Sequence, residues 1–192
     1  MDYRIKLLTS VVVMLVALMA VACGSSDSSV FTKTASGLQT VVILSGTATG
    51  ETRLINGTNM ECFDVDLVSP NSGAIIGKAT DCLDLASISP IGDDGGFHLE
   101  NTTFFHFDEG TIVSVSQTTA QPLSDPLPTS GPTHLTSEVG SGNNILAEMG
   151  TGKFAGAVGN TRLSGSVDMS SFAGPGTPAT FDCIFVIKIA DL

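Results

Sequence analysis

The sequence predicts an all-β protein, and two features carry this prediction. After residue 22 the apolar residues show no helical period, and they alternate instead with polar residues in short segments rich in Val, Thr and Phe. The chain also contains 21 Gly and 8 Pro, which separate those segments as turns. We expect one domain over residues 38–192, because this length is sufficient for a single hydrophobic core.

Residues 1–22 have the pattern of a cleaved signal peptide, which is expected to be helical. Arg4 and Lys6 precede an apolar run over residues 7–19, and Ala20-Val21-Ala22 suits cleavage before Cys23. The apolar run is shorter than the roughly 20 residues that a membrane span needs. We therefore expect this segment to be removed.

The sequence Ala20-Val21-Ala22-Cys23 resembles a bacterial lipobox. The resemblance implies a diacylglycerol on the sulfur of Cys23 and a further acyl chain, such as palmitate, on its amine. Several acyl chains on one residue give a stable membrane anchor. Gly24, and not Asp, follows the cysteine, which in a Gram-negative cell implies the outer membrane, facing the periplasm. An ordinary secreted protein cut at the same bond is the alternative.

The charge of the chain excludes some partners. The full sequence has a net charge of −11, and removal of Asp2, Arg4 and Lys6 with the signal peptide makes it about −12. Nucleic-acid binding needs clustered Lys and Arg, so we expect none here. We expect membrane contact through the lipid on Cys23, and residues 23–37, which are rich in Ser, are predicted to be a flexible tether.

The first predicted strand covers residues 38–47, and a hairpin follows it. Its strands cover residues 61–68 and 74–83, with a three-residue loop that ends at Gly73 in a left-handed conformation. In this register facing residues sum to 144, so Cys62 lies opposite Cys82. We expect a disulfide between Cys62 and Cys82, although Cys183 is an alternative partner for Cys82.

A second hairpin is predicted over residues 97–107 and 111–119, through Asp108-Glu109-Gly110. With three loop residues, facing residues sum to 218, and Asn101 lies directly opposite Gln117. The predicted inner face carries Phe97, Leu99, Asn101, Thr103, Phe105, Phe107, Val113, Val115 and Gln117, and the outer face carries His98, Glu100, His106, Ser114 and Ser116. Buried amides need hydrogen bonds, so the two amides either bond each other or a trapped water, or they line a ligand cavity.

Three more strands are predicted at residues 133–139, 161–169 and 179–189, with rim loops at 87–96 and 120–132. The late part of the chain contains Gly150-Thr151-Gly152-Lys153-Phe154-Ala155-Gly156-Ala157-Val158-Gly159, Arg162-Leu163-Ser164-Gly165 and Phe181-Asp182-Cys183-Ile184-Phe185-Val186-Ile187. These motifs resemble the bacterial allene oxide cyclase barrel-like proteins and the plant dirigent proteins. The resemblance implies an eight-stranded antiparallel β-barrel of calycin type over residues 38–192. A barrel of that size can hold one small apolar molecule.

The expected function is a noncatalytic binding or scaffold barrel for a small apolar ligand. The alternative is a cyclase or a dirigent-like guide that confines a reactive apolar substrate. Asp81 is the weak candidate for a catalytic acid, and its other interpretation is a carboxylate at the barrel mouth bonded to the backbone. The candidate cavity residues are Phe63, Leu67, Asn101, Thr103, Phe105, Gln117, Phe181, Cys183 and Phe185.

We expect no cofactor and no metal, because His98, His106 and His134 share no short ligand spacing. Cys183 lies among large apolar residues, which favours an inert core thiol over a nucleophile. Dimers and trimers are common in the resembled families, so the resemblance is compatible with a homo-oligomer.

Overall fold

The computed structural model describes residues 30–92, 96–123, 132–138 and 143–190, and for residues 132–138 only the backbone. Its elements are ten β-strands and two short 3₁₀ turns. They are β1 (Thr32–Thr34), β2 (Gly37–Thr49), β3 (Glu51–Ile55), β4 (Thr58–Val68), β5 (Ile75–Ile91), β6 (Gly96–Phe107), β7 (Gly110–Pro122), β8 (Pro132–Glu138), η1 (Ala147–Met149), η2 (Gly152–Phe154), β9 (Gly159–Asp168) and β10 (Pro178–Ile189).

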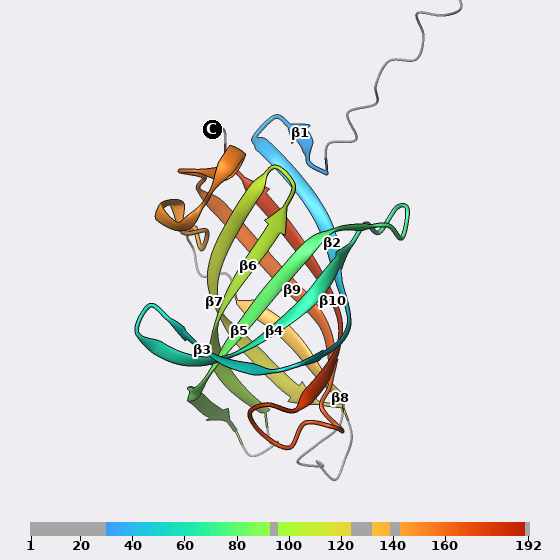
Figure 1. Ribbon diagram of the computed structural model, residues 1–192, viewed down its shortest axis with the longest axis vertical. Helices are drawn as coiled ribbons and strands as arrows, with labels where there is room; N and C mark the ends of the chain where they lie inside the picture. Colours follow the sequence, from blue (N-terminus) through green and yellow to red (C-terminus); the bar gives the residue numbers. More distant parts are fainter. Residues whose placement is uncertain (1–29, 93–95, 124–131, 139–142, 191–192) are drawn as a thin grey trace, which may run out of the picture.

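The strands form one antiparallel sheet in the order β1-β2-β10-β9-β8-β7-β6-β5-β4-β3. β2 also pairs with β4, from Ile43 opposite Val68 to Ser45 opposite Asp66, so the sheet curls into a nearly closed barrel (Figure 1). The prediction of an all-β antiparallel barrel is confirmed. The strands predicted at 38–47, 161–169 and 179–189 correspond to β2, β9 and β10 with ends shifted by one or two residues.

The folded part of the chain begins earlier than Leu38. Phe31 is buried against Phe107 and Phe154, and β1 pairs with the start of β2. The prediction of a flexible tether is therefore wrong for residues 30–37, because burial of an aromatic ring and strand pairing fix this segment. Residues 1–29, which include the predicted signal helix and Cys23, lie outside the described residues.

The hairpin of β4 and β5 has the predicted register. Cys62 lies opposite Cys82 and Asp66 lies opposite Lys78, and Gly73 has a φ of 68°. One irregularity follows Leu67, where Val68 pairs with Ile75. The pattern of opposite charges and matched thiols was sufficient here because the loop really does place Gly73 in the left-handed region.

The predicted register of β6 and β7 is wrong by one residue. Phe107 lies opposite Gly110, so the turn contains only Asp108 and Glu109, and Asn101 faces Ser116 in place of Gln117. Gly110 has a φ of 144°, and a Cβ there would lie 2.1 Å from a backbone carbonyl oxygen of the 150–152 segment. This glycine permits close approach of that segment as the first residue of a strand, not as the last residue of a loop.

The corrected register exchanges the two faces of β7. Ser114 and Ser116 take inward positions, whereas Val113, Val115 and Gln117 leave the inner face. A one-residue shift has this effect because side chains alternate between faces along a strand.

The hairpin of β3 and β4 is not among the predicted elements. Its turn is Asn56-Gly57, with φ values of 49° and 89°, which is the usual two-residue connection between antiparallel strands. This hairpin projects from the side of the barrel in Figure 1. Met60 and Cys62 of this hairpin form a small outer cluster with Cys82 of β5, and this cluster is separate from the main core. Ile55 and Phe104 pack against it.

The glycine-rich segment 150–159 covers one end of the barrel. Phe154 of η2 is buried and its ring meets those of Phe31 and Phe107 at centroid distances of 5.0 and 6.0 Å. Lys153 donates its backbone N–H to Glu109 and its ammonium group binds the Glu109 carboxylate at 2.6 Å. Through these contacts the segment packs against the barrel end that carries the β6–β7 turn.

Candidate functional site

Aromatic side chains fill part of the barrel interior. The rings of Phe105 on β6 and Phe185 on β10 meet edge to face, with 5.0 Å between their centroids. β6 and β10 are on opposite sides of the ring of strands, so this contact crosses the barrel. Phe63 and Phe181 make a second contact at 5.3 Å. These predicted cavity residues, together with Leu67, belong to the packed core.

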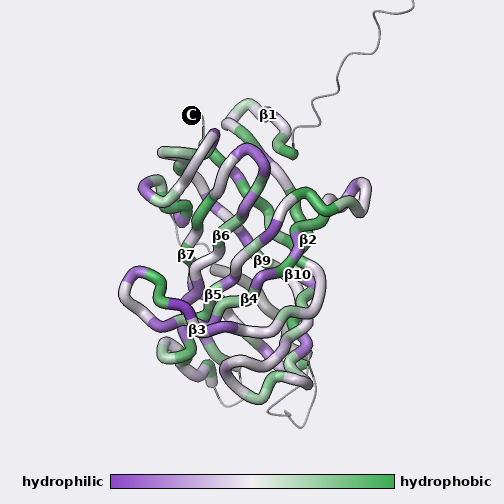
Figure 2. Tube along the Cα trace, in the orientation of Figure 1, coloured by the Kyte–Doolittle hydropathy of each residue, from purple (hydrophilic) through white to green (hydrophobic). Residues whose placement is uncertain are grey.

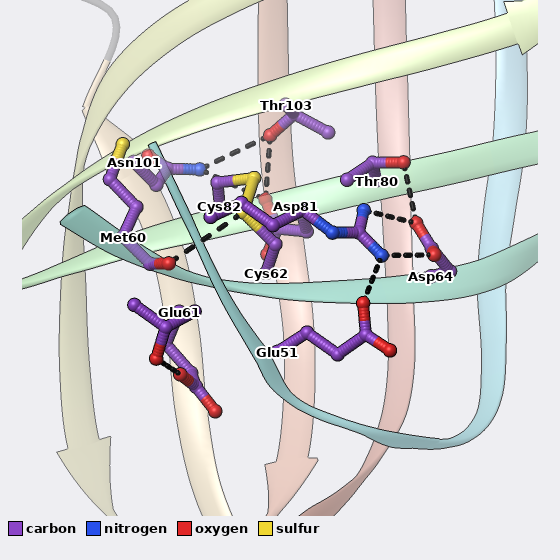
Figure 3. Close-up of a disulfide and its surroundings, with 12 residues drawn as sticks. Glu51, Met60, Glu61, Cys62, Asp64, Thr80, Asp81, Cys82, Asn101 and Thr103 are labelled. Carbon is purple, nitrogen blue, oxygen red and sulfur yellow. Dashed lines mark hydrogen bonds and ion pairs between the residues drawn. A yellow bond between two sulfur atoms is a disulfide. The ribbon is translucent and has the colours of Figure 1, made fainter. Parts of the chain in front are cut away.

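A polar network lies next to these rings and is centred on Asp81. The hydroxyl of Thr103 donates to Asp81 Oδ1 at 2.7 Å, and the amide of Asn101 donates to the same oxygen at 3.4 Å. The hydroxyls of Ser116 and Thr118 donate to Asn101 Oδ1 at 2.7 and 3.1 Å. Figure 3 shows Asp81, Asn101 and Thr103 converging behind the disulfide. Hydroxyls thus satisfy the oxygen of the buried amide, and the Asp81 carboxylate and the Thr103 hydroxyl accept from its nitrogen.

Gln117 does not belong to this network. It is exposed, and Asn101 faces Ser116, so the predicted amide pair is wrong. Ser116 and Thr118 were not predicted as partners of Asn101, because a three-residue loop would place both side chains on the outer face. The sequence gives no signal for the two-residue turn, because such turns usually contain Asn or Gly with positive φ, and neither Asp108 nor Glu109 has a positive φ. The shorter turn moves every even-numbered residue of β7 inward.

Burial raises the pKa of two ionisable groups of the interior, Asp81 and Cys183. Asp81 is 6 % exposed, and desolvation raises the pKa of its carboxyl above the ordinary value, against the opposing effect of the hydrogen bonds from Thr103 and Asn101. Desolvation, with the nearby Asp81 charge, raises the pKa of the Cys183 thiol to about 12. Cys183 is free and buried, so at neutral pH it is a protonated core thiol and a poor nucleophile.

The structure contains the disulfide between Cys62 and Cys82, with an S–S distance of 2.08 Å. Figure 3 shows it between β4 and β5 beside Met60. It belongs to the outer cluster and not to the interior that holds Cys183, so the alternative bridge from Cys82 to Cys183 is absent.

An ion pair holds β3 across the outer face of β4. Arg53 donates to Asp64 through its two terminal guanidinium nitrogens, Nη1 at 3.0 Å and Nη2 at 2.6 Å, and Nη2 also binds Glu51. The hydroxyl of Thr80 donates to Asp64 at 2.6 Å. The hydrogen bond from Arg53 is the main reason that the pKa of Asp64 falls to about 2. Because these side chains are partly exposed, the pair orients the hairpin more than it stabilises the fold.

On the described part of the chain, two grooves open on the outside of the barrel. The larger, of about 830 Å³, lies between β1, the start of β2 and the β4–β5 loop. We call it the uncharged groove, because none of its lining residues is charged. They are Val30, Thr32, Thr34, Gln39, Thr40, Val41, Ser69, Pro70, Asn71, Ser72, Ala74, Ile75 and Ile76. Sequence patterns could not find this groove, because three separate segments form it.

The smaller groove, of about 320 Å³, lies between the tip of the β3–β4 hairpin and the outer face of β6 and β7. Asp84 and Glu100 contribute to its wall, and these two residues face each other across β5 and β6. Gln117 also lines this groove, which places it outside the barrel.

No family model, curated protein or solved structure matches this chain. Within the described ranges, no three His, Cys, Asp or Glu side chains gather in a way that would hold a metal ion. In the same part of the chain, no helix has the length and apolar character needed to span a membrane.

Proposed function

We propose that this protein is a lipid-anchored protein of the cell envelope whose barrel is a noncatalytic binding module for a small apolar ligand. The contact of Phe105 with Phe185 across the barrel carries this proposal, because packed rings occupy the space where a substrate would have to lie. The uncharged groove, whose volume is in the usual range for ligand sites, is the binding site in this proposal.

The proposal includes the finer fold and the location. The ring of strands β2-β10-β9-β8-β7-β6-β5-β4 is compatible with an eight-stranded barrel of the allene oxide cyclase and dirigent type. The lipobox-like residues before Cys23 support an anchor in the outer membrane of a Gram-negative cell.

The cyclase alternative has less support. Its candidate acid, Asp81, is buried and already accepts hydrogen bonds from Thr103 and Asn101. General acid catalysis needs a carboxyl within hydrogen-bond reach of the substrate. The ring packing and the network therefore favour binding without chemistry.

Mass spectrometry of the acylated protein, purified gently from its own membrane, tests the proposal. Denaturing spectra report the acyl chains on Cys23, and native spectra report any stoichiometric apolar compound. Ala74→Asp, which adds a charge to the uncharged groove, is expected to abolish binding of that compound, whereas Ala86→Asp, at another exposed alanine outside the groove, is expected to leave the compound bound. An unmodified Cys23, a protein without bound compound, or a compound that resists Ala74→Asp would each contradict the proposal.

A further inference from the structure

The strongest unexplained feature is the position of the uncharged groove relative to the anchor. Val30 lines this groove and is the first described residue, and only six residues lie between it and Cys23. The seven Cα–Cα steps from Cys23 to Val30 reach at most roughly 25 Å in a fully extended chain. A random coil of the same length would span about 15 Å. A lipid on Cys23 would therefore hold the groove close to the bilayer surface.

The chemistry of the groove wall matches that position. The mature chain carries a charge of about −12, yet all thirteen lining residues are uncharged. Carboxylates near a lipid surface lose hydration and are repelled by anionic headgroups, so a wall without them removes both penalties. The hydroxyl and amide side chains of the wall, such as Thr32 and Gln39, can bind headgroup and ester oxygens.

An exposed apolar side chain stands at the same place. Ile75, at the start of β5, is 64 % exposed and lines the groove beside Ile76. Figure 2 colours the segments that lead into the β4–β5 loop as hydrophobic. The smaller groove differs, since its wall includes Asp84 and Glu100. Of the two grooves, the one next to the tether is the one suited to lipid.

We infer that the uncharged groove faces the bilayer that holds Cys23, and that its apolar ligand is a lipid of that bilayer. This inference rests on the proposed function and names the ligand of its site. The barrel then lies on the membrane by the β1 end, with Ile75 inserted among the lipid chains and the hydroxyl side chains of the groove at headgroup level.

A tryptophan reporter tests the inference in the acylated full-length protein. The chain has no Trp, so Ile75→Trp introduces a single indole at an exposed position. The protein is reconstituted into phosphatidylcholine vesicles whose acyl chains carry bromine, which quenches indole emission on contact. Ile88→Trp is the matched control, because Ile88 is 47 % exposed on the same strand, roughly 40 Å further along β5.

We expect a blue shift and loss of emission for Ile75→Trp and neither change for Ile88→Trp. Vesicle flotation separates the two hypotheses. A protein that does not float with vesicles would contradict the anchor and hence the proposed function. A protein that floats but shows no quenching of Ile75→Trp, or equal quenching in the control, would overturn the docking inference alone. A bound compound that native mass spectrometry identifies as other than a membrane lipid would also overturn it.

Discussion

Replacing Phe105 with alanine would remove a ring that crosses the barrel. Phe105 is completely buried, and its edge-to-face partner Phe185 is 3 % exposed. Truncation of a buried phenylalanine to alanine costs about 3–5 kcal/mol, of which the ring pair contributes about 0.5–1.5 kcal/mol. A domain with a total stability of roughly 5–15 kcal/mol would lose a large part of it.

Urea denaturation followed by far-ultraviolet circular dichroism measures this loss. Intrinsic fluorescence is unsuitable, because the chain has no Trp and its one Tyr, Tyr3, lies in the predicted signal peptide. Ile184→Ala is the control, since Ile184 is next to Phe185 on β10 but 48 % exposed, and we expect it to change stability by at most about 0.5 kcal/mol. A cost below about 1 kcal/mol for Phe105→Ala would refute the filled interior, since lining an open cavity leaves few packing contacts to lose.

Three further predictions concern ionisation and close packing. Burial raises the pKa of Asp81, so above its ordinary pKa of 3.8 the unfolded chain has released a proton that the folded chain retains. Stability then falls as pH rises through the raised pKa, and Asp81→Asn is expected to remove this slope from denaturation curves; an unchanged slope would exclude Asp81 as its source. Arg53→Gln is expected to move the pKa of Asp64 from about 2 back toward 3.8, as a carboxyl NMR titration would show. The stability that Asp64 contributes is present above pH 3.8 and is lost as pH falls through about 2, and because both side chains are partly exposed the variant should lose less than about 1 kcal/mol. A titration that stays near 2 would mean that Arg53 is not the cause. Gly110→Ala should destabilise the fold more than Gly57→Ala, because the new Cβ would meet a carbonyl oxygen at 2.1 Å at the first site and nothing within 4 Å at the second. Both glycines have positive φ, so each substitution also carries a conformational penalty of about 1 kcal/mol. Equal losses of unfolding free energy in urea denaturation would show that the close contact at Gly110 is relieved at no cost.

The two predicted hairpins show how far local patterns reach. The β4–β5 register followed from matched residues on both strands, including Cys62 opposite Cys82. The β6–β7 register failed although its sequence looked similar, because Gly110 is required by a contact with a segment some forty residues later. The sequence does not show whether a glycine is required by a turn or by close contact with a distant backbone segment. Only the folded structure distinguishes these two causes.

The polar interior shows the same division. Alternation placed Asn101 and Thr103 on the inner face, and the structure places them there. Their true partners on β7 depended on the register, and Gln117 moved outside when the register shifted by one residue. The Asn56-Gly57 turn, by contrast, is a local hairpin signal that the sequence itself contains.

The sequence by itself determined the all-β class, the position of most strands and the acidic charge, and it placed Cys62 opposite Cys82 with Cys183 as an alternative partner. These depend on side-chain alternation, turn residues and composition, which act over a few neighbouring positions. Only the tertiary structure decided that Phe105 meets Phe185 and that β1, β2 and the β4–β5 loop enclose an uncharged groove. Both depend on which strands face each other after the sheet curls, and that geometry arises from contacts between segments distant in the chain.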